Sequence, residues 1–266
     1  MGLTNAVAWF QRFEDYAFKE FIDKFVIIYL DDILIFSKTE KEHVEHVTKV
    51  LEKLEEYDLQ AKLEKCFFHQ TEIEFLGYIV SGTEIRMSPT KVEAVANWPT
   101  PTNKKEVLSF LGFANFYRKF IYWFGWNVAS ISRLTWKEVL FEWTEKQQQC
   151  FDELKRLFTL EPILVHFQLK KESTMETDVL DEAIGGCLSQ LDKLGQLRLV
   201  VYYSRKLTKA ELNYDMHDKE MLAIVECFRT WRHYLEGAYH QVKVITNHKN
   251  LTYCITTKVL NQRQVR

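Results

Sequence analysis

The sequence has 266 residues, of which 47% are hydrophobic, and a formal net charge of −2. This length and composition support a packed core in one large domain or two smaller ones, and the near-neutral charge excludes an overall basic field, so contacts with nucleic acid would have to come from local basic patches. The five cysteines are scattered and contain no Cys-x-x-Cys pair, which favours buried thiols in a reducing compartment over a cysteine zinc site or a disulfide framework.

The chain begins with a predicted helix over residues 4–23. Its charged residues recur every few positions, so it contains no apolar run suited to a signal peptide or a membrane span. We therefore expect a cytoplasmic or nuclear protein with no membrane partner.

The next stretch, FVIIYLDDILIF at residues 25–36, places two adjacent carboxylates between two apolar runs. The pattern predicts a hairpin of two short strands joined at Asp31 and Asp32. Apolar residues at three- and four-residue spacing then predict a helix over 40–57.

Extended segments and a further helix complete the first half. Residues 67–80 and 82–89 favour strands, with glycines marking the turns. Two prolines, at positions 99 and 101, cannot continue a helix and mark a joint. A helical pattern resumes over 104–121.

The second half has a different order of elements, after a change of composition near residues 159–173. Strand patterns occur at 173–179, 184–190 and 197–205, a long helix is predicted from about 213 to 236, and a last strand covers 240–247. Three strands, a helix and another strand indicate a mixed α/β domain.

The Asp31–Asp32 pair has two interpretations. Two aspartates in a hairpin are by themselves typical of a solvated turn. Here the flanking strands are apolar at nearly every position, which predicts strands covered on both faces and a turn held close to the core. Two carboxylates in such a place repel each other unless a cation neutralises them, and Mg²⁺ favours oxygen ligands of this kind.

A second acidic pair is predicted in the second half. Asp178 lies at the end of a strand, and Glu220 begins a stripe on the long helix that continues through Ile224, Phe228, Trp231 and Leu235. A glutamate on the face toward the sheet needs a partner, and an aspartate on the adjoining strand would complete a metal site. Surface charges at the ends of a helix and a strand remain an equal alternative.

Four collinear segments of the sequence resemble the Pol polyprotein of gypsy-type LTR retrotransposons. They are GLTNAVAWFQR at 2–12, YLDDILIFS at 29–37, the segment from FLGYIV to RKFI at 75–121, and the segment from YYSRKL to YLEG at 202–237. The second is similar to the YxDD box of reverse transcriptases, and the last to the fused RNase H domain.

The resemblance implies an α+β chain that combines two folds. We expect a partial reverse-transcriptase palm and helical thumb over residues 1–125, a connecting segment over 126–167, and an RNase H-like mixed-sheet domain over 168–266. The implied reactions are RNA-directed DNA synthesis and cleavage of RNA in RNA–DNA hybrids, both by two-metal phosphoryl transfer.

The resemblance also implies site residues. In this family the hairpin aspartates hold catalytic divalent ions, which makes Asp31 and Asp32 ligands for Mg²⁺ or Mn²⁺. Contacts with a primer–template duplex are implied for Gln11, Tyr29, Leu30, Leu76, Gly77, Gly112, Asn115 and Phe116. Leu76 and Phe116 also fit ordinary core packing. In the RNase H-like domain, Asp178 and Glu220 are the implied catalytic and metal-binding residues for an RNA–DNA hybrid.

Several departures from the family pattern bear on activity. A third nuclease carboxylate is expected where the sequence reads TNHKNL, so Asn247 supplies a neutral group in its place. The family's third polymerase carboxylate and fourth nuclease carboxylate would fall before and after this sequence, so we expect a chain truncated at both ends. Loss of charge from such clusters weakens metal binding, and we expect both activities to be lost or strongly reduced.

Two functions therefore stay open. One is a reverse transcriptase/RNase H fragment with little remaining catalysis, and the other is a non-enzymatic nucleic-acid-binding or assembly module derived from a retroelement. Unpaired apolar sheet edges also predict self-association; a monomer by light scattering at micromolar concentration would contradict this.

Overall fold

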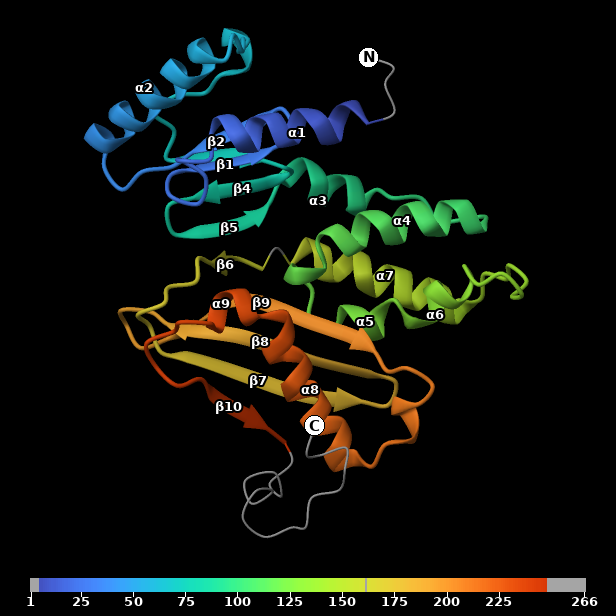
Figure 1. The fold of residues 1–266 in the computed structure, drawn as a ribbon. Helices are drawn as coiled ribbons and strands as arrows, with labels where there is room; N and C mark the ends of the chain where they lie inside the picture. The colour runs from blue at the N-terminus through green and yellow to red at the C-terminus, as the bar shows by residue number, and fades with distance from the viewer. Residues whose placement is uncertain (1–4, 161, 248–266) are drawn as a thin grey trace. The chain divides into compact units, whose positions relative to one another are not determined.

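The computed structural model describes residues 5–160 and 162–247, which form two compact units divided between Gly82 and Thr83 (Figure 1). We refer to residues 1–82 as the first unit and to residues 83–266 as the second unit.

The first unit combines two helices with two hairpins. Its elements are α1 (Ala6–Ala17), β1 (Val26–Tyr29), β2 (Asp32–Ile35), α2 (Glu40–Glu56), a short 3₁₀ helix (Leu63–Lys65), β3 (Glu72–Phe75) and β4 (Tyr78–Ser81). Strands β1 and β2 pair antiparallel, as do β3 and β4. Phe18, Phe25, Val26 and Val50 form the core between the first hairpin and the helices. The predicted hairpin and the helix after it are confirmed.

The prediction that both faces of the first hairpin are covered is wrong. Ile27 is 43% exposed and Tyr29 is 52% exposed, and both aspartates at the turn are exposed. Successive strand residues point to opposite faces, so Val26 enters the core while its neighbour Ile27 faces away from it. An apolar run therefore does not by itself show that both faces of a strand are buried.

The second unit begins with a helical layer. Its elements are β5 (Glu84–Met87), α3 (Pro89–Ala96), α4 (Lys104–Phe116), a 3₁₀ helix (Arg118–Phe120), α5 (Phe124–Asn127), α6 (Ala129–Arg133), α7 (Glu145–Thr159) and β6 (Leu164–Val165), which pairs with β5. Asn103 Oδ1 accepts a hydrogen bond from the Glu106 backbone amide at 3.0 Å and so caps the start of α4. Phe110 and Phe151 are fully buried, with ring centroids 4.7 Å apart, and join α4 to α7.

A mixed sheet with one long helix forms the rest of the second unit (Figure 1). Its elements are β7 (Ser173–Leu180), β8 (Ala183–Leu191), β9 (Leu197–Lys206), a 3₁₀ helix (Glu211–Asn213), α8 (Met216–Thr230), α9 (Arg232–Leu235) and β10 (Lys243–Thr246). The strand order is β10-β7-β8-β9, with β10 parallel to β7 and the other pairs antiparallel. The predicted succession of three strands, a helix and a strand is confirmed.

The long helix differs from its prediction in two ways. It is interrupted at Trp231, which separates α8 from α9. Its buried stripe runs through Glu220, Ala223, Cys227 and Trp231, whereas Phe228 is 38% exposed. The prediction that Phe228 lies on the buried stripe was wrong. From Glu220 the buried residues continue three positions later at Ala223 and then every four positions, which leaves Phe228 outside the stripe.

The two faces of the sheet are covered by different segments. Neighbouring strand residues point to opposite faces, and a methyl group added at Gly186 would lie 2.8 Å from Cys227 Sγ of α8. A methyl group added at Gly185 would instead lie 3.0 Å from the Trp123 ring. The segment that precedes α5 therefore packs against the face opposite α8.

Within the described ranges, no helix is both long enough and apolar enough to cross a lipid bilayer.

Candidate functional site

The Asp31–Asp32 turn closes the first hairpin with only two residues between the strands. Tyr29 pairs with Asp32, and Leu30 has a positive φ of 54°. Positive φ at the first turn position is typical of hairpin turns that match the twist of the strands. The tight turn presents both carboxylates to solvent side by side.

Gln11 of α1 holds this turn in place. Its Oε1 accepts a hydrogen bond from the Leu30 amide at 2.7 Å, and its Nε2 donates to Asp15 Oδ1 at 3.0 Å. Both ends of the carboxamide are thus bound within the protein. The role that the structure supports for Gln11 is positioning the Leu30–Asp31 turn, and its contact with nucleic acid stays a prediction.

Glu14 is a buried acid that the sequence analysis did not name as a site residue. It is 3% exposed, and its Oε2 has no hydrogen-bond partner among the described residues. Burial and the nearby charges of Asp31 and Asp15 raise its pKa to about 7. The sequence signal that could have identified it is a glutamate among the apolar residues of α1.

We expect Glu14→Gln to stabilise the chain by about 1–3 kcal/mol at about pH 8, because it removes a negative charge that burial and two neighbouring acids disfavour. The raised pKa of Glu14 means that its charged form is the costly one, so the penalty falls as the pH drops through 7 and vanishes below the ordinary value of 4.5. Urea unfolding of both proteins in EDTA, at about pH 8 and about pH 5.5, measures the difference. A gain that is the same at both pH values would contradict the assignment. Glu20→Gln, at an exposed position just after α1, is the matched control.

Five other predicted nucleic-acid contacts lie on a half-buried hairpin turn and on an exposed face of a helix. Leu76 and Gly77 form the two-residue turn of the β3–β4 hairpin, with φ values of 53° and 76°. Gly112, Asn115 and Phe116 lie on one face of α4 in its last turns and are all exposed. The alternative that Phe116 is a core residue is therefore wrong.

Asp178 of β7 and Glu220 of α8 each bind a residue at the end of β10. Because Thr246 is in register with Thr177, the next residue, Asn247, lies beside Asp178 and its Nδ2 donates to Asp178 Oδ1 at 3.2 Å. Thr246 Oγ1 donates to Glu220 Oε2 at 2.9 Å. Consecutive residues thus bind the two predicted acids, and Glu220 is buried. This excludes the alternative that both acids are ordinary surface charges.

A cavity of about 210 Å³ opens beside Asp178. Its lining includes Tyr122, Trp123, Glu176, Cys187 and Asn247. Burial, and then the charge of Glu176, raises the pKa of the Cys187 thiol to about 11, which makes this thiol a poor nucleophile at neutral pH. The sequence reasoning missed the two aromatic residues, since only the folded chain brings them to the sheet.

The two sites differ in how well they suit a divalent ion. Asp31 and Asp32 offer exposed carboxylate oxygens, the ligands that Mg²⁺ and Mn²⁺ prefer. In the second site, the Asn247 amide directs an N–H group at Asp178. That contact satisfies the carboxylate without a cation, so the donor set fits a metal less well.

Comparison with known proteins agrees with this arrangement. Residues 1–80 match the family model described as reverse transcriptase (RNA-dependent DNA polymerase), and residues 143–244 match the model of an RNase H-like domain found in reverse transcriptase. The Tf2-3 and Tf2-4 transposon polyproteins of Schizosaccharomyces pombe (strain 972 / ATCC 24843) are each 40% identical over 257 residues, or 97% of this chain. The chain spans 19% of the length of each of these relatives.

Solved structures of foamy viral protease-reverse transcriptase share the fold. One of them, in complex with an RNA/DNA hybrid, has a TM-score of 0.75 at 21% identity. The match covers all of this chain and 36% of the foamy viral chain. Another, the dRH form in complex with double-stranded DNA, has a TM-score of 0.81 at 20% identity. This match covers all of this chain and 47% of the foamy viral chain. The chain therefore carries a match to a reverse transcriptase and a match to an RNase H-like domain, and it fits a fragment of a retrotransposon Pol polyprotein.

Proposed function

We propose that this chain is a reverse transcriptase/RNase H fragment of a gypsy-type retrotransposon that binds RNA–DNA hybrid, with RNA-directed DNA synthesis and cleavage of the RNA strand both strongly reduced. The observation that carries the proposal is the hydrogen bond from Asn247 Nδ2 to Asp178 Oδ1. This bond joins Asn247, a neutral residue at the position where a third acid is expected, to Asp178, the first acid of the RNase H-like site.

The residues have distinct tasks in this proposal. Asp31 and Asp32 would hold Mg²⁺ or Mn²⁺ beside the primer end, and Gln11 keeps the turn that carries them in place. Asp178 and Glu220 would hold the ions of the nuclease site. When bound, such ions supply positive charge that stabilises the phosphoryl-transfer transition state and lowers the pKa of an attacking water. Asn247 adds no negative charge, which weakens ion binding there.

Duplex contacts are proposed for exposed residues of the two units. Phe116 and Asn115 on α4, and the Leu76–Gly77 turn, are open to solvent or at a hairpin tip. The foamy viral relatives were solved with an RNA/DNA hybrid and with double-stranded DNA, which supports nucleic acid as the partner class. A cytoplasmic or nuclear location follows from this partner.

A non-enzymatic binding module is the second candidate. The observation in its favour is that neutral partners, Thr246 and Asn247, satisfy both acids of the nuclease site. Such a site keeps its shape without metal.

Divalent-ion dependence separates the two candidates. We expect salt-sensitive hybrid binding with slow cleavage that requires Mg²⁺ or Mn²⁺ and vanishes in Asp178→Asn, and DNA synthesis on an RNA template that vanishes in Asp31→Asn. Hybrid binding without either activity, unchanged by a chelator, supports the binding module. Cleavage that persists in Asp178→Asn would contradict the assigned site.

A further inference from the structure

Basic side chains gather at one end of the sheet of the second unit. The strands β7, β9 and β10 all start at this end, because β8 runs antiparallel between β7 and β9 (Figure 1). We call this surface the basic end, and its cations, which are exposed or half-buried, are Lys170, Lys171, Lys193, Arg198 and Lys243. The acids beside them in the chain are Glu172 and Asp192. The basic end is therefore locally positive in a chain whose net charge is −2.

Hydrogen bonds hold the turn before β7 in place. Gln190 of β8 is 1% exposed; its Nε2 donates to the Gln168 carbonyl oxygen at 2.9 Å, and its Oε1 accepts from the Gln168 amide at 2.8 Å. The Tyr239 amide, in the segment before β10, donates to the Leu169 carbonyl oxygen at 3.0 Å. Lys170 Nζ lies 6.0 Å from the centroid of the exposed Tyr239 ring. The basic end is thus a defined surface that joins segments far apart in the chain.

Asp192 offsets only part of this positive charge. Its Oδ1 accepts the Leu194 amide at 2.8 Å and the Gln196 amide at 2.9 Å, so the carboxylate shapes the β8–β9 turn. The Gln196 and Leu194 hydrogen bonds, and then the charges of Arg198 and Lys171, lower the pKa of Asp192. One carboxylate therefore lies between two cations, which leaves positive charge for a partner.

The basic pairs that stand out in the sequence are used inside the second unit instead. Arg118 and Lys206 donate to backbone carbonyl oxygens. Arg205 forms a bidentate ion pair with Glu211 at 2.8 and 2.9 Å. Burial lowers the pKa of Lys119. These side chains serve packing, so they have less to offer a phosphate than the cations of the basic end.

The basic end and Asp178 share one face of the sheet. Lys243, Ile245 and Asn247 are exposed, whereas the residues between them are half-buried. Asn247 donates to Asp178, so Lys243 lies on the face that carries this acid. At about 3.3 Å per residue, Lys243 is about 13 Å from Asn247 along the strand, which matches about four base pairs of a duplex. Lys171 lies three residues before the register partner of Lys243, so it is about seven base pairs from Asp178.

We propose that the basic end binds the phosphate backbone of an RNA–DNA hybrid, about four to seven base pairs from the phosphate that lies at Asp178. The inference rests on the proposed function, which is hybrid binding, and adds the surface that supplies much of the affinity. Carboxylates repel phosphates, so cations elsewhere must supply the attraction, and lysine and arginine do so by releasing the counterions of the duplex. Phosphate contacts also set the register of a protein on a duplex without reading its sequence.

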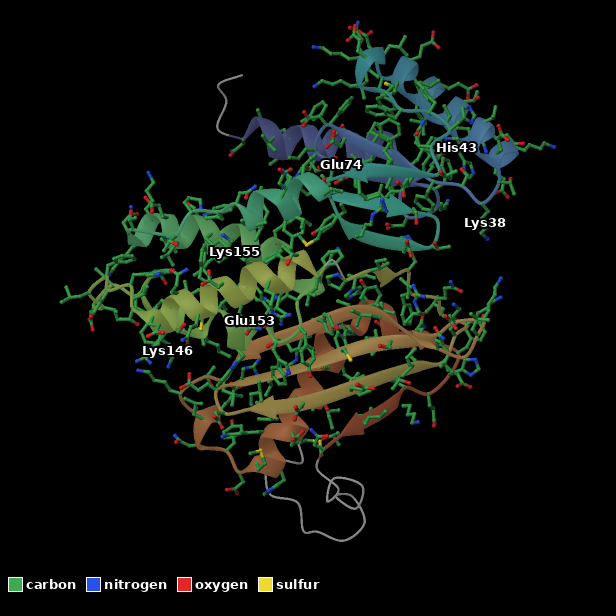
Figure 2. The ribbon with its side chains drawn as sticks, turned by 180° about the vertical axis from the view of Figure 1, so that it is seen from behind. Lys38, His43, Glu74, Lys146, Glu153 and Lys155 are labelled. Carbon is green, nitrogen blue, oxygen red and sulfur yellow. The ribbon has the colours of Figure 1, made fainter. Side chains whose placement is uncertain are left out.

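The test measures hybrid binding by the whole chain in EDTA, using fluorescence anisotropy between about 50 and 200 mM salt. The double variant Lys170→Gln/Lys243→Gln should bind about tenfold more weakly, and the slope of log Kd against log salt should fall by about 1.8 for two lost phosphate contacts. Two hybrids of unrelated sequence should show the same loss. Lys146→Gln is the matched control, because Lys146 is an exposed lysine of α7 (Figure 2), and it should change neither the affinity nor the slope.

A hydroxyl-radical footprint of the bound hybrid tests the position of the contact. The double variant should lose backbone protection about four to seven base pairs from the site of slow cleavage, and protection lost elsewhere would overturn the assignment. A parent chain that binds hybrid, with a double variant that behaves as Lys146→Gln does, would overturn this inference and leave the proposed function standing. A parent chain that binds no hybrid would contradict both. Urea unfolding should give the same midpoint for all variants, because the substituted lysines are exposed.

Discussion

Asn247→Asp is expected to raise Mg²⁺-dependent cleavage of the RNA strand in an RNA–DNA hybrid by about 10²-fold or more. The new carboxylate would lie where the Asn247 amide now donates to Asp178, and two adjacent carboxylates bind a cation far better than a carboxylate and an amide. Several kcal/mol of added charge stabilisation correspond to a rate change of this size. Initial cleavage rates at matched enzyme concentration, with and without Mg²⁺, measure it.

The controls separate charge from shape. Asn247→Ala removes the hydrogen bond and adds no charge, so it should not activate cleavage. In EDTA, Asn247→Asp should be less stable than the parent chain because the two carboxylates repel each other, and Mg²⁺ should restore its stability. If Asn247→Asp cleaves no faster than Asn247→Ala, the neutral residue is not what limits the nuclease site.

Trp123→Ala is expected to destabilise the second unit by about 3–5 kcal/mol, the usual cost of removing a large buried aromatic side chain. Trp123 is buried, its φ is 52°, and its ring packs so closely on β8 that a methyl group at Gly185 would lie 3.0 Å away. The ring also lines the cavity beside Asp178. Removing it therefore opens the face of the sheet that carries the site. Urea unfolding followed by circular dichroism measures the loss.

Trp136→Ala is the matched control, because Trp136 is 54% exposed and its removal should change stability by less than about 0.5 kcal/mol. Hybrid affinity should fall in Trp123→Ala and not in Trp136→Ala. Equal effects of the two substitutions would show that the segment before α5 is not an integral part of the RNase H-like fold. The predicted domain boundaries at 125 and 167 remain a prediction, and this experiment also bears on them.

Local patterns predicted much of the fold. The apolar runs around Asp31 and Asp32 gave the hairpin, because alternation and turn chemistry act over a few residues. The strands that become β7, β8 and β9 were predicted to within one residue at each end for the same reason. The stripe on α8 was wrong at Phe228, since a helical pattern with several apolar choices does not reveal which one faces the sheet.

The candidate sites were predicted less completely. The family resemblance named Asp178, Glu220 and Asn247, but not the hydrogen bonds that join Asn247 to Asp178 and Thr246 to Glu220. These depend on the parallel register of β10 with β7, across a gap of about seventy residues in the chain. Glu14 was not predicted as a site residue, since its burial depends on the tertiary fold of the first unit.

By itself, the amino-acid order determined which elements form and which acids accompany them, because helix periodicity, strand alternation and tight turns are properties of neighbouring residues. Only the tertiary structure decided which acid meets a neutral partner, which aromatic ring covers the sheet opposite α8, and which cations gather at the basic end. Those contacts join segments that are far apart in the chain, and packing in three dimensions is what brings them together.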